Sequence, residues 1–122
     1  MLCALYQRLI MFIAKTWNNG HHHLSGAGYG IKISLEDREQ FFKSSWQSVV
    51  LHLSGYDRSV EVNVAKASFW NRACGELIKK DIGIWLQQNH RDCWPYRQPH
   101  EVRLIVVGER EFKIELIKNN KV

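Results

Sequence analysis

The chain has 122 residues, of which 45% are hydrophobic, and its 17 Lys and Arg against 12 Asp and Glu give a formal net charge of +5. This length predicts one domain, and the composition is typical of a folded protein, which excludes global disorder. The basic excess favours a polyanionic partner such as nucleic acid, although many unrelated proteins share it.

Three cysteines, Cys3, Cys74 and Cys93, predict a reducing compartment, because an odd number with no secretory signal argues against a disulfide framework. The apolar run at residues 2–14 is too short to cross a bilayer and is interrupted by a glutamine and an arginine. We therefore expect a cytoplasmic protein without a membrane partner.

The start of the chain is open to two interpretations. Residues 1–10 could form a first helix or an uncertain N-terminal extension, whereas residues 11–122 are expected to form a single α+β domain. That domain begins with a strand at 11–17. A turn at 18–20, where Asn and Gly tolerate positive φ, and a glycine-rich loop then lead to a second strand at 29–34.

A short helix is predicted at residues 35–42. Ser34 is its expected N-cap, because Ser34-Leu-Glu-Asp37 resembles a capping box and places acidic residues in the first turn. The residues expected to be buried on this helix are Leu35, Phe41 and Phe42.

The clearest local pattern is a hairpin at 48–53 and 60–64, in which apolar and polar residues alternate, so that one face of the pair is expected to contact solvent. A main helix is predicted at 68–90, with Ser68 as its cap. Gly75 and Gly83 weaken this helix, and a break near Gly75 is an alternative. Its apolar stripe is formed by Trp70, Cys74, Leu77, Ile78, Ile82, Trp85 and Leu86.

Two further strands at 102–107 and 111–117 form a last hairpin, before a frayed tail at 119–122. The order is therefore β-β-α-β-β-α-β-β. Because the strands come in hairpin pairs, we predict an α+β fold with a mostly antiparallel sheet or open barrel of about six strands, two helices and an optional N-terminal helix.

This order of elements resembles the DNA-binding pseudobarrel, in which hairpins form an open barrel flanked by two helices. The segments Trp17-Asn-Asn-Gly20, Ser25-Gly-Ala-Gly-Tyr-Gly30 and Ser68-Phe-Trp70 are also similar to those of small uncharacterised bacterial proteins, including ones carried on mobile gene cassettes. The first resemblance implies that loops and strand faces hold DNA. The second brings no assigned activity.

The stretch 17–30 combines four glycines, three consecutive histidines and two aromatic residues, so it offers both backbone freedom and side-chain chemistry. Its aromatic residues could stack on bases, and lysines just outside them would add positive charge. The predicted nucleic-acid-binding residues are Lys15, Trp17, Asn18, His21, His22, His23, Ser25, Gly26, Gly28, Tyr29, Lys32, Arg91 and Arg97.

Other chemistry for this loop is less favoured. Residues 26–30 could cradle a phosphate with backbone N–H groups, but they precede a strand and not a helix, so close packing or a flexible connection is the preferred interpretation. His21 and His23 could share a face, but no CxxC or HExxH pattern supplies a third metal ligand. His90-Arg-Asp-Cys93 has ligand types at a workable spacing, and Cys74 could join it in space, but a polar loop with solvated or hydrogen-bonded histidines is the preferred interpretation. We therefore expect no metal and no cofactor. Ser25 beside the histidines lacks a nucleophile elbow, which makes an enzyme the less favoured class.

The sequence thus predicts a non-catalytic polyanion-binding module whose expected partner is DNA or RNA. Two alternatives remain open. One is a protein–protein interaction module or homodimeric accessory protein of a mobile element. The other is a small hydrolase or ligand-binding protein that uses His21–His23.

Overall fold

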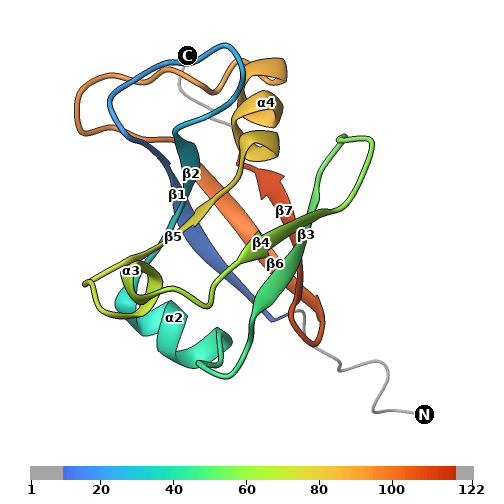
Figure 1. The fold of residues 1–122 in the computed structure, drawn as a ribbon. Coiled ribbons are helices and arrows are strands. Elements are labelled where there is room, and N and C mark those ends of the chain that lie inside the picture. Colours follow the sequence, from blue (N-terminus) through green and yellow to red (C-terminus); the bar gives the residue numbers. More distant parts are fainter. Residues whose placement is uncertain (1–9, 118–122) are drawn as a thin grey trace.

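The computed structural model describes residues 10–117, which form one sheet with helices at both of its ends (Figure 1). In chain order the elements are β1 (Met11–Asn18), β2 (Tyr29–Ile33), α2 (Leu35–Phe41), β3 (Ser48–Leu53), β4 (Val60–Asn63), α3 (Ala67–Trp70), β5 (Gly75–Ile78), α4 (Lys80–Gln88), β6 (Glu101–Gly108) and β7 (Glu111–Leu116). The alternatives for residues 1–10, apart from Ile10, and the predicted tail at 119–122 lie outside the described residues.

Within the described residues, seven strands form one sheet in the order β4-β3-β7-β6-β1-β2-β5. Neighbouring strands are antiparallel except β3 and β7, which are parallel. The edge strands β4 and β5 come close together, so the sheet nearly closes into a barrel (Figure 1). The predicted α+β class with a mostly antiparallel open barrel is confirmed, although the described chain has seven strands and three helices rather than six and two.

The prediction of one continuous main helix at 68–90 is wrong, because a strand separates two shorter helices there. Helix α3 ends at Trp70, and β5 then pairs with β2 in the register Gly75↔Ile33 before α4 begins. The break falls at Gly75, where an added Cβ would lie 2.8 Å from the Phe69 ring. Ser68 is also not the cap, since Lys66 holds that position without a side-chain hydrogen bond. Pairing with an open sheet edge therefore outweighs the helical spacing of the apolar residues.

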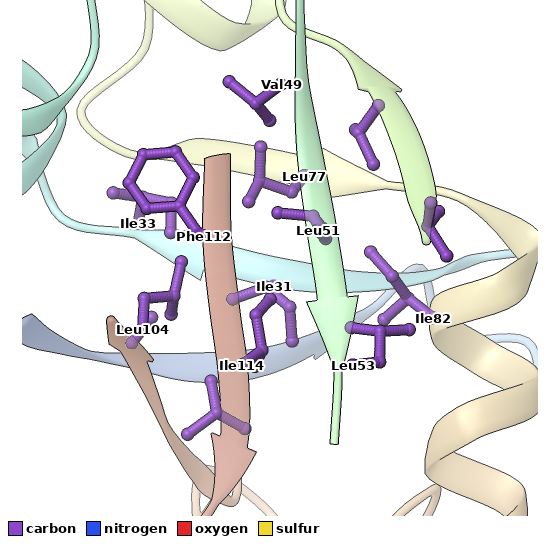
Figure 2. Packing of buried hydrophobic residues seen from close by; sticks show 14 of the residues in the cluster. Ile31, Ile33, Val49, Leu51, Leu53, Leu77, Ile82, Leu104, Phe112 and Ile114 are labelled. Carbon is purple, nitrogen blue, oxygen red and sulfur yellow. The ribbon is translucent and has the colours of Figure 1, made fainter. Parts of the chain in front are cut away.

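The barrel interior is filled by alternate residues of every strand. On β1, for example, Phe12 and Ala14 are buried whereas Met11 and Ile13 point outward and are exposed. Figure 2 shows the aliphatic and aromatic side chains of β2, β3, β5, β6 and β7 meeting between the two sides of the sheet. Each fully buried side chain of this size contributes about 1.5–3 kcal/mol through removal of apolar surface from water.

The predicted hairpin at 48–53 and 60–64 is confirmed as β3 and β4, with Leu51 and Val62 buried and Glu61 exposed. Trp85, which we expected in the core, is fully buried on α4. Its indole N–H donates a 2.8 Å hydrogen bond to the Ser54 carbonyl, which ties α4 to the end of β3.

Helix α2 begins as predicted, since the Ser34 hydroxyl accepts a hydrogen bond from the Asp37 backbone N–H. The expected burial is only partly correct. Phe42 is buried, but Leu35 is 45% exposed, because the inward position of this helix is taken by Arg38.

The Arg38 side chain is buried beneath α3. Its guanidinium donates 2.8 Å hydrogen bonds to the carbonyls of Phe69 and Arg72, and it lies over the Trp70 ring. Arg38 therefore satisfies carbonyls at and beyond the C-terminal end of α3, which that short helix cannot satisfy itself.

In the described part of the chain, no helix has the length and apolar character needed to cross a membrane.

Candidate nucleic-acid interface

The pairing of β1 with β2 brings several predicted binding residues onto one surface. The register places Lys15 opposite Lys32 and Trp17 opposite Gly30. Because Thr16 and Ile31 point into the barrel, the side chains of Lys15, Trp17 and Lys32 lie on its outer face. Both lysines are exposed.

A row of four charged residues crosses this outer face. Lys15 is the register partner of Lys32 on one side and of Glu101 on the other, and Lys32 is in turn the partner of Glu76. Like charges placed directly opposite each other destabilise a sheet by a few tenths to about 1 kcal/mol. Each lysine thus has one like-charged and one opposite-charged register partner, and the two lysines lie together at the centre of the row with a carboxylate at each end.

Next to the lysines lies a small apolar shelf formed by Trp17, Gly30 and Ile78. Gly30 pairs with Trp17 on β1 and with Ile78 on β5, and both of these side chains are half-buried. A Cβ on Gly30 would lie 3.2 Å from Ile78 Cγ1, so the Ile78 side chain leans over the glycine. Gly30 itself is buried, so the surface of the shelf is made by the Trp17 and Ile78 side chains that flank it.

Lys79 and Lys80 follow the shelf directly, and both are exposed at the start of α4. The next residue, Asp81, accepts hydrogen bonds from the Tyr56 hydroxyl at 2.9 Å and from Arg58 Nε at 3.1 Å. Burial raises the pKa of the Asp81 carboxyl, but these hydrogen bonds outweigh it and hold that pKa below its usual value. The carboxylate closest in sequence to Lys79 and Lys80 is therefore already paired with Arg58.

The glycine-rich loop between β1 and β2 is held against α4. Gly26 and Gly83 are in such close contact that a Cβ on either residue would clash with backbone of the other segment. The Gly26 N–H donates to the His23 carbonyl, and the Asn19 N–H donates to the Gly28 carbonyl. Gly26 and Gly28 therefore serve close packing, the interpretation preferred from the sequence, and the Gly26 N–H already has a partner.

The turn at the start of this loop forms as predicted. Gly20 has φ +92°, and its N–H donates to the Asn18 side-chain oxygen at 2.8 Å. Asn18 is thus engaged in holding the loop.

The stacking role predicted for Tyr29 does not fit its position, because its ring points into the barrel and is fully buried. Its hydroxyl lies 2.9 Å from His22 Nδ1. Burial raises the pKa of this phenol, and the nearby Asp92 and Cys93 raise it further, whereas the Gln87 side chain lowers it. Tyr29 anchors the loop through His22 and offers no free face to a base.

The three histidines are exposed, and the rings of His21 and His23 lie 5.8 Å apart on the same side of the loop, as expected from their spacing. Among residues 10–117, no group of three His, Cys, Asp or Glu side chains could hold a metal ion. The Ser25 hydroxyl makes a local contact, accepting a 3.4 Å hydrogen bond from the Ala27 N–H.

A shallow depression of about 420 Å³ lies elsewhere, at the β6–β7 turn and the segment before β3. It is lined by Ser45, Trp46, Gln47, Glu109 and Arg110. No histidine of the loop reaches it, so this hollow gives the hydrolase alternative no support.

Arg91 and Arg97 belong to the segment between α4 and β6, which is joined to β1 by hydrogen bonds between His100 and Thr16. Arg91 donates a 3.5 Å hydrogen bond to the Asn89 carbonyl, and Arg97 stacks over the exposed Tyr96 ring. The structure therefore gathers Lys15, Trp17 and Lys32 and adds Ile78, Lys79 and Lys80, which the sequence assigned to a helix.

Comparison of the chain with protein-family models, with curated proteins and with solved structures found no match. The resemblances to the pseudobarrel and to gene-cassette proteins stay predictions, and function is inferred from the chemistry of the residues described above.

Proposed function

We propose that the protein is a non-catalytic polyanion-binding module whose ligand is nucleic acid, held on the outer face of β1, β2 and β5. The observation that carries this proposal is the direct opposition of Lys15 and Lys32. Both lysines are exposed and lie side by side, so an anion placed between them would contact two positive charges, while Glu101 and Glu76 limit this position on either side.

A phosphate group suits this position on chemical grounds. Lysine ammonium groups contact phosphates as point charges and release condensed counterions when they do so, which makes the affinity depend on salt. Lys79 and Lys80 extend the positive charge beyond the shelf, since Asp81 is already engaged by Arg58. A cytoplasmic location belongs to the same proposal and agrees with the free thiols of Cys74 and Cys93.

Lys32→Ala is expected to weaken oligonucleotide binding and to reduce the slope of log affinity against log salt by about one unit, because one phosphate contact is lost. The measurement is fluorescence anisotropy of a labelled oligonucleotide across a salt series. Lys43→Ala is the matched control, since it removes the same charge from an exposed position after α2.

The control should leave the slope unchanged. An equal loss in both variants would mean that net charge and not this face determines binding. Failure of the unmodified protein to bind at low salt would refute the proposal.

The interaction-module alternative also has a specific observation in its favour. At the other end of the β1–β6 outer face, Met11, Ile13 and Val107 expose between 41% and 52% of their surface. Such an apolar patch suits a partner protein or a second copy of the chain. A molar mass that rises with protein concentration, in the absence of nucleic acid binding, would favour this alternative.

A further inference from the structure

We infer that the outer face of β1, β2 and β5 takes one unpaired strand of nucleic acid, with a base stacked on Trp17. This inference rests on the proposed function and narrows it from polyanions in general to single-stranded nucleic acid. Two independent features support it, namely the width of the positive strip and the apolar shelf beside it.

The positive strip is too narrow for a duplex. Adjacent strands lie about 4.8 Å apart, so Glu101 and Glu76 limit the strip to roughly 14 Å from one carboxylate position to the other, with the two lysines between them. A duplex presents two rows of phosphates across grooves about 6 and 12 Å wide. If one row lay on the lysines, the second would approach a carboxylate, whereas a single strand avoids this repulsion.

The shelf supplies a surface for a base. Trp17 lies two residues from Lys15 along β1, or about 7 Å, so the indole and the ammonium can act on the base and phosphate of one nucleotide. Gly30 removes the side chain that would otherwise stand beside the indole, and Ile78 closes the far side. Trp17 is half-buried, so part of its indole is accessible, and aromatic side chains are the surfaces on which bases stack in proteins that bind single strands.

The bound nucleic-acid strand can continue past the shelf. Lys79 and Lys80 are exposed directly after Ile78, on the side of the shelf away from Lys15 and Lys32. Phosphates on both sides of the stacked base would then meet lysines. The side-chain oxygen of Asn18, the residue after Trp17, is engaged with the Gly20 N–H, and the shelf is apolar, so it selects for a stacked ring and not for a particular base.

The experiment measures the affinity of the full chain for three ligands, each of which is either labelled or used as a competitor. These are a twelve-nucleotide oligothymidylate, a duplex of the same length, and inorganic polyphosphate, which has charge but no bases. Anisotropy is measured for the unmodified protein and for Trp17→Leu, which fills space without an aromatic face, and for Trp17→Phe, which restores one. Tyr96→Ala removes an aromatic ring that is 83% exposed in the α4–β6 segment, and it tests whether any exposed ring near β1 would serve equally well.

The unmodified protein should bind the oligothymidylate more tightly than the duplex. Trp17→Leu should weaken oligothymidylate binding about 5- to 150-fold. The affinity for polyphosphate should stay within about twofold, and the slope of log affinity against log salt should not change. Trp17→Phe should recover most of the loss, and Tyr96→Ala should change nothing.

Equal affinity for single strand and duplex, unchanged by Trp17→Leu, would overturn this inference and leave polyanion binding standing. Absence of binding to all three ligands would overturn both.

Discussion

Replacing Trp85 with alanine is expected to lower the free energy of unfolding by about 3–5 kcal/mol. The side chain is fully buried between α4 and the sheet, and its indole N–H donates to the Ser54 carbonyl. The change therefore leaves a large cavity and removes the hydrogen bond that joins α4 to β3. Because α4 also supports the glycine-rich loop through Gly83, local order around Gly26 should decrease as well.

Urea titration followed by circular dichroism measures this effect. Lys79→Ala is the control on the same segment, since its side chain is exposed, and its cost should stay within about 0.5 kcal/mol. Similar losses in the two variants would show that the wrong face of α4 has been assigned to the core.

Arg38→Ala is expected to cost about 3–5 kcal/mol, since each hydrogen bond made by a charged group contributes about 1.5–3 kcal/mol and one buried and one partly buried carbonyl lose their donor. The affected carbonyls are those of Phe69 and Arg72. Loss of the guanidinium should loosen α3 and the turn into β5, and thereby the edge of the sheet that carries Ile78.

Arg72→Ala provides the matched control, because Arg72 takes part through its backbone carbonyl while its side chain is exposed. The same denaturant titration applies, and this variant should lose little stability. If Arg38→Ala were as stable as the unmodified protein, water would have to replace the guanidinium, and the role assigned to Arg38 would be wrong.

Local sequence signals predicted the hairpins and the start of α2 well. Alternating valines predicted β3 and β4 because an antiparallel pair with one buried face has a period of two. Ser34 predicted the start of α2 because a hydroxyl followed by acidic residues can satisfy free backbone N–H groups.

The segment 68–90 could not be predicted by the same means. Leu77 and Ile78 fit a helical stripe, but they lie in a strand because β2 needs a neighbour on its outer edge. That pairing depends on residues more than forty positions away, and helical spacing carries no information about it. Buried Arg38 was missed for a related reason, since its partners are the carbonyls of Phe69 in α3 and of Arg72 just after it, more than thirty positions away.

The candidate site was predicted in part. Lys15, Trp17 and Lys32 flank the same loop in the sequence, and the register of β1 and β2 brings them onto one face. Tyr29 was expected beside them, but its side chain points into the barrel. Alternate residues of a strand lie on the same face, so Tyr29 faces inward together with Ile31 and Ile33. Residues 29 and 32 of a strand point to opposite faces. Taking Lys32 as outward-facing would therefore have placed Tyr29 inside the barrel and excluded it from the binding site.

The most direct test of the proposed interface is nitrogen-15 NMR of the protein titrated with the twelve-nucleotide oligothymidylate. We predict that the largest chemical-shift changes fall on the backbone amides of Lys15, Lys32 and Ile78 and on the indole N–H of Trp17. Amides of β3 and β7, which form the side of the barrel opposite β1, β2 and β5, should shift little. Saturable changes confined to those strands, or to the shallow depression at Trp46, would contradict the proposed interface.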